Sequence, residues 1–397
     1  MTDGEERRAR AALTALVEPG DLKVWDAVER VGAAELVRRI AANSDRHLEP
    51  FDLADRLLER AGKAGVRLVL PGDREWPHGL DALLTLANRQ QRKVAGGESL
   101  PTIDRTVAPP VALWLRGQPR LAETVAKSVA IVGSRAASGY GTHVAGELAY
   151  GLADRGWTVV SGGAYGIDGA AHKGAMAADG PTVAVLASGA DVPYPPGHAS
   201  LFEKIAVDGL LLSEWPPGTT PQRPRFLVRN RVIAALTAGT VVVEAGVRSG
   251  AKQTARRAYE LGRALMAVPG PVTVAGSVGC HELVRGPLAA RLVTRAEEVL
   301  EEVGRIGADL TAPLRAPKDW RDTLDAMSSA VVEAMPAVDW MPLDDLRAAV
   351  PVAAARIEEI VAGLAVAGRL ERDGTRVRFA AAGRADSQPR VVKPVVR

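Results

Sequence analysis

The sequence predicts an α/β protein whose centre is a Rossmann-like, doubly wound and mostly parallel sheet. Between residues 111 and 303, short apolar runs alternate with segments of helical periodicity. The apolar runs are nearly continuous, which is typical of strands buried on both faces. Helical crossovers between such strands favour parallel pairing, and right-handed crossovers produce a doubly wound sheet. With 397 residues, the chain is long enough for two or three domains.

Residues 1–64 are expected to form a helical domain of the SAM or helix-hairpin-helix kind. Apolar residues recur at helical spacing in three segments, residues 8–17, 25–42 and 51–62. A small helical bundle is the simplest interpretation, because the glycine-bearing hairpin of a nucleic-acid-binding motif is not evident. Residues 65–110 are expected to be a connector, in which a short strand precedes a polar and exposed loop at 88–106.

The Rossmann-like domain is assigned to residues 111–303, where seven apolar runs predict the strands. These runs are residues 111–117, 128–133, 157–163, 182–189, 209–214, 240–246 and 264–270. Proline and charge predict a linker at 304–321. Two or three helices and a hairpin turning at Asp373-Gly374 predict a winged-helix-like domain at 322–380, and the basic residues 381–397 are expected to be a disordered tail.

Composition excludes several classes of protein. The net charge of +3 permits a polyanionic partner without requiring one, and Cys280 is the only cysteine, which excludes a disulfide or a cysteine-based zinc site. The six histidines are scattered, so neither a metal nor another cofactor is expected. The charged start does not resemble a secretory signal, and no apolar run approaches the ~20 residues needed to span a bilayer. A cytoplasmic protein without a membrane partner is therefore expected.

Two glycine-rich loops follow predicted strands, where open parallel sheets bind their ligands. The first loop contains Gly133, Ser134 and Arg135, and the second contains Ser161, Gly162 and Gly163. Small residues allow the backbone to approach a ligand, and free amides at a helix start attract anions. The dinucleotide fingerprint is incomplete because Val144 stands where its last glycine is needed. The loops predict a phosphate site and argue against NAD.

An arginine-dense segment, residues 222–263, distinguishes this chain from an ordinary Rossmann protein. It carries nine basic residues against Glu244 and Glu260 only. Guanidinium groups beside glycine-containing loops form phosphate sites. The candidate ligands in this segment are Arg229, Asn230, Arg231, Ser249, Gly250 and Lys252.

Three further residues near the second loop have less specific interpretations. Asp168 would repel a bound phosphate, so we expect it to cap the N-terminus of the following helix. Tyr165 is a candidate for stacking on a base, although tyrosines are also common on loop surfaces. His172 is more simply explained as a packed histidine than as an acid or base.

These residues together resemble the DNA-processing protein A (DprA/Smf) family. The resemblance runs in order through residues 129–135, 161–176, 182–198, 211–221, 226–236, 241–255 and 267–272. It implies a non-enzymatic protein that binds single-stranded DNA without sequence preference and loads RecA recombinase onto it, usually in natural transformation, and a homodimer is expected. The family's phosphate pocket carries over onto Arg135, Arg229, Arg231, Ser161, Gly162, Ser249 and Gly250.

The chain departs from the family pattern at several positions. His198 stands where the family usually has Asn, and Leu227 where it usually has Pro. An apolar pair is usual after Ser249-Gly250, where this chain has Ala251-Lys252-Gln253, and residues 281–293 are more irregular than their equivalents. These departures bear on the fine geometry of the site.

Two alternatives belong to other classes of protein. A phosphoribohydrolase with a related sheet would need a Pro-Gly-Gly motif and a catalytic glutamate after the strand at 240–246, and both are missing there. A protein–protein adaptor could use the same basic segment to bind an acidic partner. Weak binding to oligo-dT would favour the adaptor over a DNA-binding protein.

Overall fold

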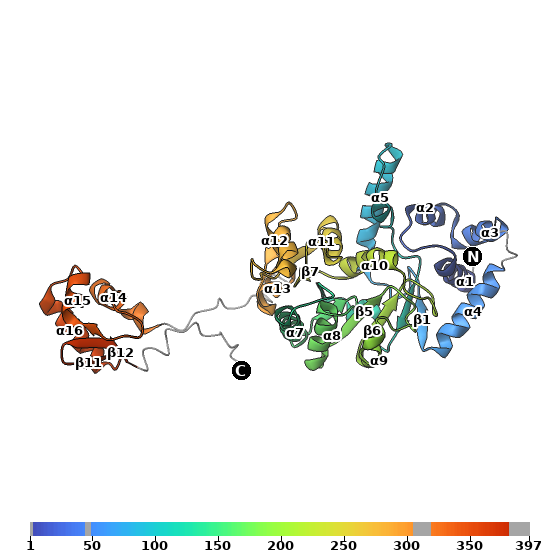
Figure 1. The fold of residues 1–397 in the computed structure, drawn as a ribbon. Helices are drawn as coiled ribbons and strands as arrows, with labels where there is room; N and C mark the ends of the chain where they lie inside the picture. The colour runs from blue at the N-terminus through green and yellow to red at the C-terminus, as the bar shows by residue number, and fades with distance from the viewer. Residues whose placement is uncertain (1–2, 44–48, 305–318, 381–397) are drawn as a thin grey trace. The chain divides into compact units, whose positions relative to one another are not determined.

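The computed structural model describes residues 3–43, 49–304 and 319–380. The chain divides into two compact units, Met1–Thr311 and Ala312–Arg397 (Figure 1). None of the described helices is long and apolar enough to cross a membrane. The predicted linker lies largely in residues 305–318, and the predicted basic tail in residues 381–397, both outside the described residues.

A nine-stranded sheet forms the centre of the first unit, in the order β1-β2-β6-β5-β4-β3-β7-β8-β9. The strands from β6 to β9 pair in parallel, whereas β1 and β2 join the edge antiparallel. This confirms the α/β, mostly parallel fold. The strands are β1 (Val66–Val69), β2 (Leu113–Arg116), β3 (Ser128–Val132), β4 (Thr158–Ser161), β5 (Thr182–Leu186), β6 (Leu210–Ser213), β7 (Gly239–Val242), β8 (Ala264–Ala267) and β9 (Arg291–Leu292).

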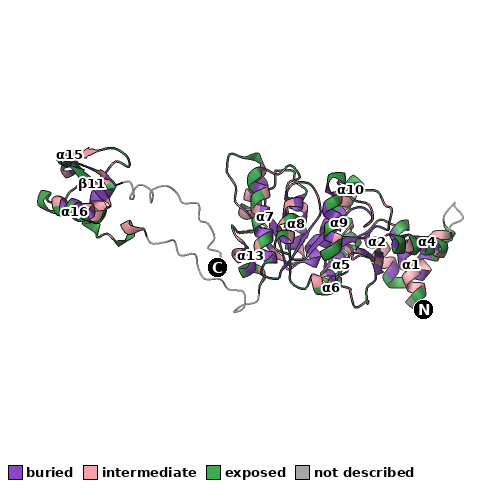
Figure 2. Ribbon diagram, turned by 90° about the horizontal axis from the view of Figure 1, so that it is seen from below, coloured by how far each residue is buried: buried purple, intermediate pink, exposed green. Residues whose placement is uncertain are grey.

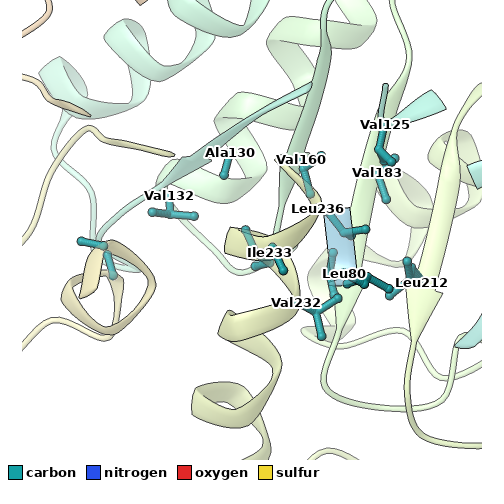
Figure 3. Close-up of a cluster of buried hydrophobic side chains, with 14 of the residues drawn as sticks. Leu80, Val125, Ala130, Val132, Val160, Val183, Leu212, Val232, Ile233 and Leu236 are labelled. Atoms are coloured by element: carbon teal, nitrogen blue, oxygen red, sulfur yellow. The ribbon is translucent and has the colours of Figure 1, made fainter. Parts of the chain in front are cut away.

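Alternate strand residues point to opposite faces, so each strand contributes to two cores. In β3, Ala130 and Val132 belong to the core on one face, which also contains Val232 and Ile233 (Figure 3). Val129 and Ile131 belong to the other face. Every residue of β3 is buried, which agrees with the continuous apolar run expected of a strand covered on both sides.

Helices cover both faces of this sheet. One face is covered by α5 (Ala82–Ala95), α10 (Arg223–Leu236), α11 (Ala251–Glu260) and α12 (Val278–Arg285). The other face is covered by α7 (Gly139–Ala153), α8 (Ile167–Ala177), α13 (Ala296–Val303) and α9 (Ala199–Asp208), and a short helix α6 (Leu121–Thr124) precedes β3. The strands between these layers are almost wholly buried (Figure 2).

The N-terminal helices share a core with the sheet. They are α1 (Asp3–Leu16), α2 (Leu22–Val31), α3 (Ala33–Ala42) and α4 (Pro50–Lys63). Trp114 of β2 is fully buried among them, and its indole Nε1 donates a hydrogen bond to Thr14 Oγ1 at 3.2 Å. These four helices therefore pack on the sheet, where they cover the face beside α9.

The strand expected at the start of the connector 65–110 is present, but a helix takes the place of part of the loop expected at 88–106. Residues 66–69 form the edge strand β1, and residues 82–95 form helix α5, which replaces the first half of the expected loop. The residues of α5 that face the core, Leu83, Leu86, Ala87 and Gln90, recur at helical spacing. The polar residues after this apolar stripe extend the same helix without packing on the core. Because they bury no side chains, they show no hydrophobic periodicity that would predict a helix.

The second unit is a small helical body with a three-stranded sheet in the order β10-β12-β11. Its elements are η5 (Trp320–Thr323), α14 (Ala326–Glu333), β10 (Met341–Pro342), α15 (Leu343–Ala349), α16 (Ala354–Val366), β11 (Leu370–Asp373) and β12 (Arg376–Phe379). The expected hairpin is present, with Gly374 at its turn in the left-handed region (φ +55°). The winged-helix-like assignment itself stays a prediction.

Candidate nucleic-acid interface

The candidate site lies where the strand order of the sheet reverses. From β3 the chain proceeds through β4 and β5 to β6 on one side, and β7 and β8 then continue on the other side of β3. The loops that follow β3 and β7 therefore diverge to opposite faces and leave a crevice at the carboxyl ends of these strands. Crevices of this kind are the usual ligand sites of open parallel sheets.

A cavity of about 410 Å³ occupies this crevice. It is lined by Gly133, Ser134 and Arg135 of the first loop, Arg229 and Asn230 of α10, and Ser249 and Gly250 after β7. The structure thus brings together seven of the residues that the sequence singled out. The other lining residues are Val132, Ala136, Ala164, Asp168, Phe226, Leu227, Ile233, Gly246, Arg248, Ala251 and Thr254.

Two exposed guanidinium groups stand at the cavity with no acidic partner. Arg135 lies over the ring of Phe226, with its Cζ 4.6 Å from the ring centroid. Arg248 is exposed on the opposite loop. Among the described residues, no carboxylate forms an ion pair with either group. The aromatic contact fixes the Arg135 guanidinium without neutralising its charge, so the charge remains available to an anion.

Arg229 forms part of the cavity floor, with only 5% of its surface exposed. Its Nη1 donates to the carbonyl oxygen of Gly162 at 2.9 Å and to that of Val185, and its Nε donates to Asn230 Oδ1 at 3.2 Å. Burial lowers the pKa of Arg229 to about 10; the nearby Arg135 lowers it further and Asp168 opposes the shift. The group is thus a cation at neutral pH, held by neutral acceptors.

Asp168 anchors the second loop from below. It does not take the N-cap position of α8, which Gly166 occupies, so the capping expectation is wrong. Instead its carboxylate accepts from the amides of Gly162 at 3.1 Å and Ala164 at 3.3 Å. Burial raises the pKa of Asp168, while Arg229 and the loop amides act in the opposite direction. The Gly162 amide, which was expected to face a ligand, is therefore already occupied.

Glu244 similarly occupies the start of α7. Its Oε2 accepts from the amide of Ser138 at 2.9 Å, and the Ser138 hydroxyl accepts from the amide of Gly141 at 3.0 Å. A carboxylate at a helix N-terminus satisfies amides that would otherwise bind an anion. Two amides at the helix start that was expected to attract phosphate are thus already hydrogen-bonded within the protein, and the arginines supply the positive charge at the cavity.

Arg231 does not reach the cavity. It is 1% exposed, and its two terminal nitrogens donate to the carboxylate of Glu214 at 2.6 and 2.7 Å. Gly20, at φ +82°, lies so close that an added Cβ would be 2.8 Å from Arg231 Nε. Arg231 thus fastens α10 to the end of β6 beneath the loop between α1 and α2, and the expectation that it contacts a ligand is corrected.

Five more of the singled-out residues lie outside the cavity. Ser161 Oγ donates to the carbonyl oxygen of Ile131 at 2.6 Å, and the Lys252 Nζ pairs with Glu282 at 2.5 Å. Gly162 and Gly163 allow close packing. A Cβ added at Gly162 would be 2.4 Å from Arg229 Nη2, and one added at Gly163 would be 2.6 Å from Phe202 Cε1. Tyr165 is 48% exposed, and its ring packs edge-on against the His198 ring with 4.8 Å between the two ring centroids.

Two departures from the family pattern have clear places in the structure. His198 is buried beside the second loop, where its Nδ1 lies 3.0 Å from the carbonyl oxygen of Gly163. Leu227 is 41% exposed and lines the cavity. Sequence reasoning did not select Arg248 and Phe226, although Arg248 directly precedes Ser249-Gly250. Among the described residues, no cluster of three potential metal ligands is present.

Fold and cavity together define a Rossmann-like protein with an arginine-lined crevice at the switch point of its sheet. The sequence profile of the DNA recombination-mediator protein A family matches residues 94–304. A Mycobacterium tuberculosis protein provisionally named DNA processing protein DprA is 43% identical over 389 residues, which cover 95% of this chain and 96% of that protein. The chain belongs to the DNA recombination-mediator protein A family.

Two further relatives agree with this assignment. The DNA processing protein DprA of Streptococcus pneumoniae is 42% identical over 193 residues, which cover 49% of this chain and 67% of that protein. The X-ray structure of DprA from Streptococcus pneumoniae matches with a TM-score of 0.58 and 31% identity, over 77% of this chain and 100% of that chain. The expected DprA/Smf resemblance is confirmed, and so is the expectation of a recombination mediator instead of an enzyme.

The structural role of Arg231 predicts a large effect on stability. Arg231→Met leaves the Glu214 carboxylate buried without a partner, and we expect the free energy of unfolding to fall by about 3–5 kcal/mol. Urea denaturation followed by circular dichroism measures the change. Adding Glu214→Leu should recover much of the loss. Arg39→Met, at the exposed pair with Glu35, is the control and should have little effect. A wild-type midpoint for Arg231→Met would contradict this role.

His172 predicts a pH dependence of stability. The Thr182 hydroxyl donates to the Val159 carbonyl oxygen, so His172 Nδ1, 2.7 Å from that hydroxyl, must be the donor there. Burial, with smaller effects of His198 and Arg229, lowers the pKa of His172 to about 3. The unfolded chain, with a pKa near 6.5, then binds the extra proton more readily. Stability contributed by neutral His172 is present above about pH 6.5 and is lost as pH falls toward 3.

The measurement is urea denaturation between pH 4 and pH 7. His172→Leu should reduce the slope of the free energy of unfolding against pH by up to about 1.4 kcal/mol per pH unit in this window, because the variant has no imidazole to protonate. His78→Gln, at a fully exposed imidazole, is the control and should leave the slope unchanged. Parallel curves for wild type and His172→Leu would show that His172 does not contribute.

Proposed function

We propose that this protein binds single-stranded DNA without sequence preference, through the phosphate backbone, and loads RecA recombinase onto the bound strand. The carrying observation is one cavity lined by the buried cation of Arg229 and by Arg135 and Arg248, neither of which forms an ion pair with a carboxylate of the described residues. Asp168 is the one carboxylate among the lining residues, so the excess charge is positive. The family supports a role in DNA recombination, and natural transformation is the setting we propose.

The phosphate ligands that we propose are the lining residues with suitable donors. Arginine forks match phosphate geometry, and the small residues of the loops after β3 and β7 allow the backbone to approach closely. We propose contacts from Gly133, Ser134, Arg135, Arg229, Asn230, Arg248, Ser249 and Gly250. Tyr165, nearly half exposed beside the second loop, is the proposed stacking residue. A cytoplasmic homodimer is part of the same proposal.

Binding of fluorescent oligonucleotides at two or more salt concentrations tests the DNA-binding part. The logarithm of affinity should fall with the logarithm of salt, with a slope of about −0.7 per contacted phosphate. Arg135→Ala and Arg248→Ala should each weaken binding to oligo-dT, oligo-dA and oligo-dC about equally and make the salt slope shallower by about 0.7. The reason is that backbone contacts carry no sequence information.

The matched control is Lys204→Ala, which removes an exposed positive charge from α9 on the other face of the sheet and should leave binding unchanged. Unchanged oligo-dT affinity in both arginine variants would exclude the cavity as the binding site. Weak, salt-insensitive binding by the wild type would instead favour an adaptor that binds an acidic protein.

Loading of RecA requires a separate measurement. On single-stranded DNA, adding the protein should shorten the lag before RecA reaches its full DNA-dependent rate of ATP hydrolysis. Arg135→Ala should lose this effect in proportion to its loss of DNA affinity, since the proposed loading acts on the strand that the cavity holds. An unchanged lag with the wild-type protein would overturn the loading step and leave the DNA-binding proposal standing.

A further inference from the structure

Helix α5 carries a group of basic residues that the cavity does not use. Its last two turns project from the layer of helices on its face of the sheet (Figure 1). Arg89, Arg92 and Lys93 are exposed there. Together with Thr85, Asn88 and Glu98 they border a surface hollow of about 600 Å³.

These basic side chains have little part in packing or in ion pairs that stabilise the fold. The buried residues of α5 end at Gln90, so the final turn of the helix contributes nothing to the core. Arg89 donates to a carbonyl oxygen, that of Glu260, at 3.1 Å. Lys93 lies 3.7 Å from Glu98, and no partner of the Arg92 side chain is found among the described residues. A projecting basic turn without a packing role is a candidate binding surface for a polyanion.

Helix α11 links this surface to the cavity. Ala251 and Thr254, in its first turn, line the cavity, and Glu260, its last residue, meets Arg89 of α5. At 1.5 Å per residue the helix spans about 14 Å, which corresponds to about four phosphates of a stacked strand. Tyr259, in the last turn of α11, is 51% exposed and offers a ring on which a base can stack.

We propose that single-stranded DNA bound in the cavity continues along α11 to a second phosphate-binding surface formed by Arg89, Arg92 and Lys93 of α5. This inference rests on the proposed function and extends the length of strand that one chain binds. Positive charge near both ends of α11, with an exposed aromatic ring in its last turn, favours a nucleic-acid strand over an acidic protein. The strand would then contact a continuous path instead of one pocket.

Oligonucleotides of two lengths distinguish binding at the cavity from binding at the surface on α5. An oligo-dT of about five nucleotides fits the cavity alone, whereas one of about twenty reaches α5 as well. Arg92→Ser/Lys93→Ser should bind the short oligonucleotide like the wild type. It should bind the long one roughly ten-fold more weakly at low salt, with a salt slope shallower by about 1.4. Arg135→Ala, in contrast, should weaken binding of both lengths.

The control variant is Lys173→Ser/Lys204→Ser, which removes two exposed lysines from α8 and α9 on the opposite face. It should leave both lengths unaffected. Wild-type binding of the long oligonucleotide by Arg92→Ser/Lys93→Ser would overturn the second surface, and so would an equal loss for both lengths. If the wild type binds neither length, the proposed function itself fails and the second surface fails with it.

Tyr259 provides an independent measurement on the same path. Tyr259→Ala should weaken the long oligonucleotide several-fold and spare the short one, because stacking on one aromatic ring contributes measurably to single-strand binding. Tyr259→Phe keeps the ring and should restore wild-type affinity. If Tyr259→Phe loses as much affinity as Tyr259→Ala, the ring does not stack on a base and the proposed path along α11 is wrong.

Discussion

The site depends on how the charges of two buried arginines on α10, Arg229 and Arg231, are stabilised. Burial of a cation is costly unless hydrogen bonds and an opposite charge compensate it. Arg231 receives both from the Glu214 carboxylate, and the result is a neutral anchor between α10 and the sheet. Arg229 receives carbonyl and amide oxygens but no paired carboxylate. The nearby Asp168 carboxylate stabilises this charge without a direct hydrogen bond, and Arg229 lines the cavity, where a bound phosphate would add to the compensation.

The acidic residues of the site reinforce this arrangement. Asp168 and Glu244 are both buried, and both accept from backbone amides of the glycine-rich loops. By occupying those amides, they hold the loops in the shape that leaves the crevice open. The same contacts occupy the amides of Ser138, Gly162 and Ala164, so these three donors are not free for a ligand. The anion binding that we propose for the crevice therefore rests on guanidinium groups, whose charge and geometry suit phosphate.

Much of the fold could be predicted because each strand of the parallel core is a continuous apolar run. The crevice could also be located, because loops after such strands meet at one edge of the sheet. The direction of individual side chains could not be predicted in the same way. Arg229 and Arg231 are two residues apart on a helix, which separates them by about 200° around its axis. Helical geometry alone therefore shows that the two side chains cannot both face one cavity. It does not show which of the two faces it.

Helix α5 shows a different limit of the sequence. Its apolar stripe occupies only the first half, and the second half is polar, so periodicity ends before the helix does. An isolated polar turn would not be stable, yet helix propagation costs little once packed residues have formed the nucleus. The core under Leu83, Leu86 and Ala87 thus supports a turn that buries nothing. Surface charge held on a structured extension in this way keeps a defined position relative to α11, which a loop of the same composition would not provide.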